Sequence, residues 1–132
     1  MMVADTDVLI DFLSGRAPVA DRIALELDRG QLRTTVVTRF ELQVGARTSR
    51  QRRLVTELLA ALPCLFLDEA GADAAARIRR SLEEGGEGIG MADSLIAGIV
   101  VAHGAMLLTR NRRHFERVPG LALGRVEPDF RE

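Results

Sequence analysis

Short apolar or β-branched runs alternate along the chain with longer stretches in which apolar residues recur at helical spacing. The short runs predict strands at Met2–Ala4, Arg33–Val37, Cys64–Leu67 and Met106–Leu108, and an edge strand within Leu121–Val126. Strands that alternate with helices, without a long linker or a repeat, indicate an α/β fold with a mainly parallel sheet. We expect a single domain over residues 1–132, with a central sheet of four to five strands flanked by helices.

Helical spacing and helix-end residues set the bounds of the helices. The stretches predicted as helices are Thr6–Leu13, Val19 to Gly30, Arg39 to about Gly45, Ser49 to Pro63, Asp68 through Leu82, Met91 to about His103, and one turn near Arg113–Phe115. Thr38 is followed three residues later by Glu41, which is the pattern of a capping box, so Thr38 is expected to cap the third helix. Asp68 is the expected cap of the fifth, and 85–90 a flexible glycine-rich loop.

Several polar residues directly follow predicted strands. Right-handed crossovers place the carboxyl ends of parallel strands at one edge of a sheet, so Asp5, Glu41 and Thr109 are expected at that edge. Asp93 lies in the first turn of a helix among small and apolar neighbours, which favours a cleft. Clustered carboxylates repel one another unless a cation neutralises them, and all-oxygen ligands suit Mg²⁺ or Mn²⁺.

Each acid also has a purely structural interpretation. Asp5 is as well explained as a helix N-cap, Glu41 as part of the capping box, and Asp93 as a first-turn acid that the helix dipole favours. Asp7 is expected to be a first-turn acid and Asp11 to face solvent. No single acid therefore decides the matter, and the hypothesis of a metal site rests on three acids at one sheet edge.

Composition narrows the function classes. The formal net charge is −1, so no global basic field indicates a nucleic-acid partner. All eighteen basic residues are Arg, which excludes a lysine Schiff base or a P-loop lysine. No apolar run is long enough to cross a membrane, and the chain opens on a strand-like run rather than a signal peptide. We expect a cytoplasmic protein.

Four segments form a familiar ordered set: Asp5–Asp11, Thr38–Gly45, Asp93–Ala97 and Leu107–Phe115. Together they resemble the PIN-domain ribonucleases, specifically VapC-type toxins of toxin–antitoxin pairs, over essentially the whole chain. The resemblance implies a three-layer PIN-like domain over residues 1–132 and a Mg²⁺- or Mn²⁺-dependent endoribonuclease that cuts structured RNA such as tRNA or rRNA. It also implies a cognate antitoxin and a homodimer.

The resemblance assigns roles by position. The catalytic acids are Asp5, Glu41 and Asp93, with Asp5 and Asp93 holding the metal ion. Thr6 and Thr109 match supporting hydroxyl positions, and Asn111 stands where the family often has a further acid, which favours one tightly held ion. Arg110 and Arg112 are the expected contacts to RNA phosphates, because they follow the strand that leads to the site.

Two other classes compete with this interpretation. A phospho-accepting receiver domain also places acids at strand ends, but it needs a lysine that this chain lacks. A catalytically weak or silent PIN-like module that binds RNA or protein is the more serious alternative, because Asn111 removes one acid. Metal-dependent cleavage that is lost in Asp93→Asn would exclude that module.

Overall fold

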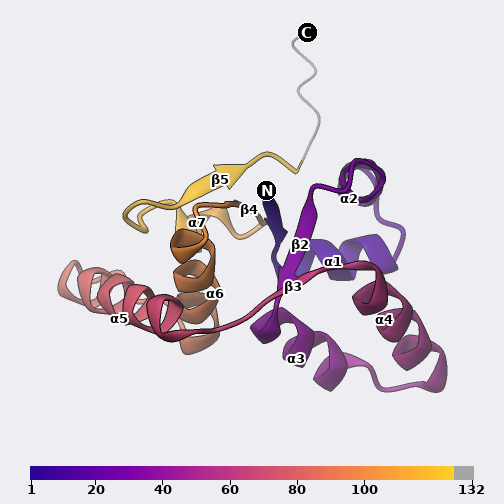
Figure 1. Cartoon of the computed structure of the whole chain (residues 1–132), viewed down its shortest axis with the longest axis horizontal. Coiled ribbons are helices and arrows are strands. Elements are labelled where there is room, and N and C mark those ends of the chain that lie inside the picture. The colour runs from indigo at the N-terminus through magenta and orange to yellow at the C-terminus, as the bar shows by residue number, and fades with distance from the viewer. Residues whose placement is uncertain (127–132) are drawn as a thin grey trace, which may run out of the picture.

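The computed structural model describes residues 1–126, and its centre is a five-stranded sheet in the order β3-β2-β1-β4-β5. All neighbouring strands run parallel, which confirms the predicted α/β class. The strands are β1 (Met2–Ala4), β2 (Leu32–Thr35), β3 (Cys64–Leu65), β4 (Met106–Leu108) and β5 (Ala122–Gly124). As predicted, the last strand lies at an edge of the sheet (Figure 1).

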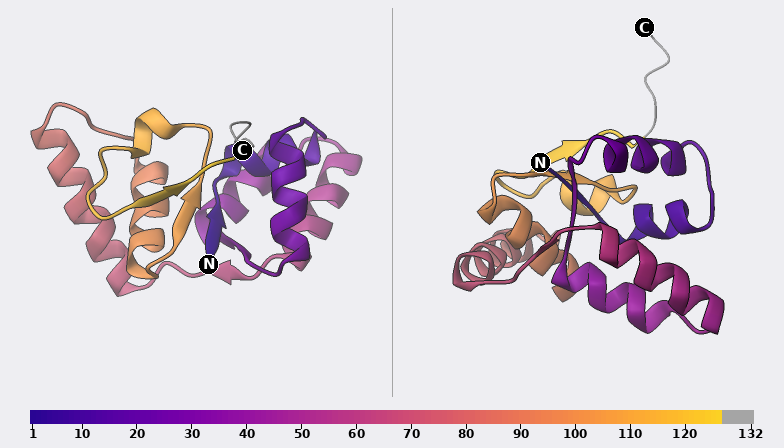
Figure 2. Two further views of the ribbon diagram at one scale, coloured as in Figure 1. Left: turned by 90° about the horizontal axis from the view of Figure 1, so that it is seen from above. Right: turned by 45° about the vertical axis from the view of Figure 1, so that its right-hand side comes forward.

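Helices cover both faces of the sheet. They are α1 (Thr6–Leu13), α2 (Val19–Asp28), α3 (Val36–Gly45), α4 (Ser49–Ala61), α5 (Glu69–Glu84), α6 (Met91–Ala102) and α7 (Arg112–Phe115). Helices α1 to α4 lie on one side of the sheet, and α5 and α6 lie on the other (Figures 1 and 2). The fold is therefore a three-layer sandwich. None of the helices in residues 1–126 has the length and apolar character needed to cross a membrane.

Alternating side chains of the two central strands separate the core into two halves. Val3 pairs in register with Leu107, and Ala4 pairs with Leu108. Val3 and Leu107 pack with α5 and α6, whereas Ala4 and Leu108 pack with α1 to α4. Because successive strand residues point to opposite faces, β1 and β4 bury both of their faces. Their carboxyl ends therefore meet in the middle of the molecule.

Helices α5 and α6 pack unusually closely, through Gly98. A Cβ atom at Gly98 would lie 2.5 Å from the Gly71 carbonyl oxygen and 2.6 Å from the Ala75 Cβ. Only glycine at this position lets the backbones of the two helices approach so closely. This contact fixes α6, and with it the helix start that carries Asp93.

Three predicted bounds are wrong. Helix α3 begins at Val36 and its cap is Thr35, whose hydroxyl accepts the Thr38 N–H at 3.1 Å; the predicted Thr38–Glu41 capping box is absent. The β-branched run was expected to continue the strand to Val37, but the helix takes its last two residues. Strand β3 ends at Leu65 rather than Leu67. A capping box does form one helix later, between Thr48 and Gln51 at the start of α4.

Candidate active site

Asp5 is at the centre of the candidate site, directly after β1. It is the N-cap of α1, and its Oδ1 atom accepts the Thr6 N–H at 2.8 Å. Its Oδ2 atom accepts the Thr109 hydroxyl at 2.7 Å. The residue is only 3% exposed. The parallel pairing of β1 with β4 brings Asp5 and Thr109 together, although 104 positions separate them. The N-cap and site interpretations of Asp5 are thus compatible.

Glu41 faces the same region from α3. Its Oε1 atom accepts the Thr6 hydroxyl at 2.7 Å, and the Thr6 hydroxyl oxygen lies 3.1 Å from that of Thr38. The shift of the helix start to Val36 is what points Glu41 at α1 instead of at its own helix end. Thr6 therefore links Glu41 to the turn that holds Asp5.

A second carboxylate, Asp7, lies beside Asp5. Its Oδ2 atom accepts the Arg110 N–H at 3.0 Å, while its Oδ1 atom is buried without a hydrogen-bond partner. The Thr109 hydroxyl, which donates to Asp5, also accepts the Asn111 N–H at 3.0 Å. Asp7 thus holds the loop that follows β4 against the first turn of α1, a role that the sequence analysis missed.

Asp93 lies in the first turn of α6, as predicted. Its Oδ2 atom is 3.1 Å from the Nδ1 atom of His114 on α7. The Asp93 charge makes a small contribution to the raised pKa of Asp5, after burial and the Asp7 charge. Asp5 precedes α1, Glu41 lies on α3 and Asp93 lies in the first turn of α6. Thr6 connects the first two acids, whereas the hydrogen bond given for the Asp93 side chain is to His114.

The two arginines expected to contact RNA have protein partners. Arg110 Nε lies 2.6 Å from Asp11 Oδ2, and Arg112 Nη1 donates to the Gly124 carbonyl at 3.0 Å. Asp11 is only 3% exposed, so the expectation that it faces solvent is wrong. Its position one helical turn after Asp7 was a usable signal, because residues four apart share a helix face.

Burial and neighbouring charge act together on Asp5. Desolvation raises the pKa of Asp5 from its ordinary 3.8 to about 7, with smaller increases from the Asp7 and Asp93 charges and opposing effects of the Thr109 and Thr6 hydrogen bonds. Burial likewise raises the pKa of Asp7, against the hydrogen bond from the Arg110 N–H. The Arg110 charge also lowers the pKa of Asp7, whereas no positively charged side chain acts on Asp5.

The donor chemistry fits a hard divalent cation. The available groups are carboxylate oxygens with threonine hydroxyls behind them, which suits Mg²⁺ or Mn²⁺ rather than zinc. A cation beside Asp5 would remove the penalty that now keeps its pKa high, and the buried Asp7 Oδ1 atom is a further unpaired oxygen. Within residues 1–126, however, no three acidic, histidine or cysteine side chains already stand in a ligand arrangement. Binding would therefore require these side chains to rearrange.

Known proteins resemble this chain over nearly its whole length. The family model described as PIN domain matches residues 2–121. The tRNA(fMet)-specific endonuclease VapC of Shigella flexneri is 32% identical over 121 residues, which cover 89% of this chain and 91% of that protein. Ribonuclease VapC19 of Mycobacterium tuberculosis is 31% identical over 122 residues, covering 92% and 97% of the two chains.

A solved structure shows the same fold. The crystal structure of DNA-bound VapBC from Salmonella typhimurium superimposes with a TM-score of 0.85 at 27% identity. The match covers 95% of this chain and 97% of that one. It spans the whole sheet together with the helices on both of its faces.

Proposed function

Because this chain belongs to the PIN-domain family, and within it to the VapC proteins, we propose that it is a metal-dependent endoribonuclease that acts as the toxin of a toxin–antitoxin pair. Its substrate is a structured RNA, and the name of the Shigella relative makes tRNA the first candidate. Such an enzyme works where its RNA is, in the cytoplasm.

The buried carboxylate of Asp5 carries this proposal. It is 3% exposed, it follows a strand at the carboxyl edge of the sheet, and no positively charged side chain lowers its pKa. A buried acid without a cationic partner destabilises a fold, so proteins rarely keep one without a functional reason. In this chain, binding of Mg²⁺ or Mn²⁺ is the functional reason that we propose for keeping the buried Asp5 carboxylate.

Each residue of the site has a definite task in phosphodiester hydrolysis. Asp5 and Asp93 are the residues that would hold the ion, and when bound the ion would supply charge stabilisation and a water of lowered pKa. Glu41, fixed by the Thr6 hydroxyl, orients water or accepts its proton. Thr109 fixes the Asp5 carboxylate by its 2.7 Å hydrogen bond. Asn111 carries an uncharged amide at the position where the family often has a further acid, which favours a single ion.

Cleavage of RNA by the purified, antitoxin-free protein tests this function. A panel of tRNA and rRNA is incubated with Mg²⁺ or Mn²⁺, with EDTA, and with Asp5→Ala and Asp93→Asn. We expect discrete cuts that disappear with EDTA and in both variants. Absence of cuts together with absence of Mn²⁺ binding would refute the enzyme and leave an RNA- or protein-binding module.

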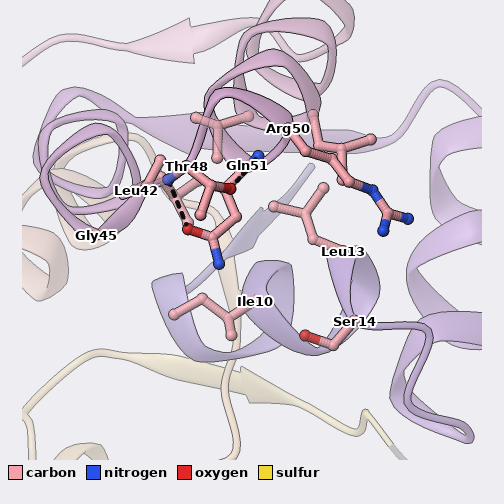
Figure 3. Close-up of a pocket in the computed structure, with 11 residues that line it drawn as sticks. Ile10, Leu13, Ser14, Leu42, Gly45, Thr48, Arg50 and Gln51 are labelled. Atoms are coloured by element: carbon pink, nitrogen blue, oxygen red, sulfur yellow. Dashed lines mark hydrogen bonds between the residues drawn. The ribbon is translucent and has the colours of Figure 1, made fainter.

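A groove between α1, α3 and α4 is the surface that we assign to the antitoxin. Its volume is about 540 Å³, and its apolar wall is formed by Ile10, Leu13, Leu42, Leu54 and Val55. Figure 3 shows Ile10 and Leu13 on one wall, opposite the Thr48–Gln51 capping box. The groove uses the same helix α1 that carries Asp5 at its cap. The groove is lined by the C-terminal end of α1, and none of Asp5, Glu41 and Asp93 is among its lining residues.

A separate apolar face is the surface that we assign to a second copy of the chain. Phe40 and Val44 are 65% and 64% exposed, and because they are four positions apart on α3 they share one face of that helix. We name these two residues the α3 face. Exposed large apolar side chains on one surface mark an interaction site.

Two substitutions test the antitoxin groove and the dimer surface independently. Ile10→Glu places a charge in the groove and is expected to prevent neutralisation by a co-expressed antitoxin while the protein remains a dimer. Phe40→Glu is expected to give a monomer by light scattering while antitoxin binding persists. Ile10 is 47% and Phe40 65% exposed, so neither change should unfold the protein. A wild-type protein that is monomeric at micromolar concentration would refute the homodimer.

A further inference from the structure

His114 contacts a candidate catalytic acid from an element that carries no catalytic acid of its own. Its Nδ1 atom lies 3.1 Å from Asp93 Oδ2, across 21 positions of sequence. The side chains of His114 and Asp93 are 56% and 28% exposed, so the contact is at the open side of the site. From the sequence, His114 is expected to be a surface residue or a group that supports the site.

The short helix α7 holds His114 in place on two sides. The next residue, Phe115, is fully buried in the core on the α5–α6 side of the sheet. Arg112, two positions earlier, donates to the Gly124 carbonyl of β5 at 3.0 Å. The imidazole therefore projects from a turn of backbone that Arg112 and Phe115 anchor.

The chemistry of the pair fixes the direction of the hydrogen bond. An ionised carboxylate only accepts hydrogen bonds, so Nδ1 must carry the proton, whether the imidazole is neutral or charged. The bond engages Oδ2 and leaves Oδ1 of Asp93 for a cation. Partners of this kind fix the orientation of a ligating group, and their removal typically weakens metal binding by about 10–100-fold.

We propose that His114 is a positioning residue, whose Nδ1–H group orients the Asp93 carboxylate toward the metal ion. This inference rests on the proposed metal-dependent function. It also accounts for Arg112, which we had expected to contact RNA: by bonding Gly124, Arg112 secures the turn that presents His114.

The chain provides a matched control in its other histidine. His103 is at the opposite end of the same helix α6 as Asp93, and its Nδ1 atom bonds the Ile99 carbonyl at 2.8 Å. His103→Ala removes an imidazole and an Nδ1 hydrogen bond without touching the site. His114→Ala removes the donor, whereas His114→Asn keeps an N–H donor at the δ position of a shorter side chain.

Mn²⁺ affinity, measured by calorimetry on the RNA-free full-length protein, tests the proposal. We expect His114→Ala to weaken Mn²⁺ binding about tenfold. His103→Ala should bind Mn²⁺ as the wild type does, and His114→Asn should recover most of the loss. Urea unfolding in EDTA should be unchanged in His114→Ala, which separates positioning from a folding defect.

The possible failures are distinguishable. If the wild type binds Mn²⁺ and His114→Ala binds it equally well, the role of His114 is refuted and the proposed function stands. If His114→Asn is as weak as His114→Ala, the hydrogen bond is not the cause. An increase in KM for RNA with unchanged Mn²⁺ affinity would make His114 a substrate contact instead. A wild type that binds no Mn²⁺ refutes both the proposed function and this inference.

Discussion

Replacing Asp5 with Asn should stabilise the metal-free protein at neutral and higher pH. The two side chains have nearly the same shape, and the Asn carbonyl can still accept the Thr6 N–H that Asp5 Oδ1 now accepts at 2.8 Å. What the substitution removes is an ionisable group whose pKa is raised from 3.8 to about 7, chiefly by burial. The substitution therefore isolates the free energy of keeping a buried negative charge.

The sign follows from the protons bound in each state. Below pH 3.8 the carboxyl is protonated in the folded and the unfolded chain alike, and its stabilising contribution is fully present. Between pH 3.8 and about 7 the unfolded chain releases the proton but the folded chain keeps it, so stability falls as the pH rises. Above about pH 7 both states are ionised, and the loss is complete.

The magnitude can be worked out for an accessible pH range. Each pH unit in which only the unfolded chain is ionised lowers the free energy of unfolding by about 1.4 kcal/mol. From pH 5 to the folded pKa of about 7 the wild type should therefore lose roughly 3 kcal/mol that Asp5→Asn keeps. Other titrating groups are common to both proteins, so their effects cancel in the difference.

Urea unfolding, followed by circular dichroism in EDTA between pH 5 and 8, measures this difference. Asp7→Asn is the matched control: the Asp7 charge is the second largest cause of the raised pKa, so its removal should move the wild-type pH dependence to lower pH without abolishing it. Added Mn²⁺ at pH 8 should stabilise the wild type but not Asp5→Asn. A stability difference that stays constant from pH 5 to pH 8 would refute the reasoning.

Two further predictions use the same unfolding assay. Gly98→Ala should destabilise the fold by about 1–3 kcal/mol, because its methyl group would overlap the α5 backbone. Gly45→Ala is the control: nothing lies within 4 Å of the new atom, so this variant should be neutral or slightly stabilising. Equal stabilities of the two variants would contradict the close packing of α5 and α6. Arg110→Ala should destabilise by about 1–3 kcal/mol because Asp11 is buried and loses its 2.6 Å partner. Unchanged stability of this variant with a raised KM for RNA would instead restore Arg110 as a phosphate contact.

Local signals in the sequence were sufficient for most of the fold. The apolar run Met106–Leu108 and the Asp68 cap are properties of a few neighbouring residues, and both are found where they were predicted. The start of α3 was missed because β-branched Val36 and Val37 favour a strand locally. In the folded protein Thr35 ends the strand by capping the helix, and the buried Thr38 hydroxyl then faces Thr6 on α1. Tertiary contacts outweighed local propensity.

The sequence predicted the close placement of Asp5 and Thr109 but not the side-chain contacts that surround them. Asp5 and Thr109 directly follow the neighbouring parallel strands β1 and β4, so the topology of the sheet is sufficient to bring them together. The partner of Asp11, by contrast, is Arg110, and no local pattern connects positions so far apart in the chain. The RNA contacts predicted for Arg110 and Arg112 remain predictions, and both side chains have protein partners that the local sequence did not indicate.

Asp5 and Asp11 make the strongest comparison within the molecule. Both are on the α1 segment and both are 3% exposed, yet Asp11 has arginine partners and Asp5 has only a hydroxyl and a backbone N–H. Burying an unpaired charge is costly, and the chain shows at Asp11 that it can place a guanidinium on this helix where one is needed. The two neutral donors, the Thr6 N–H and the Thr109 hydroxyl, orient the Asp5 carboxylate without neutralising its charge. That arrangement leaves Asp5 available to a cation from outside the chain, which an arginine in the same place would exclude.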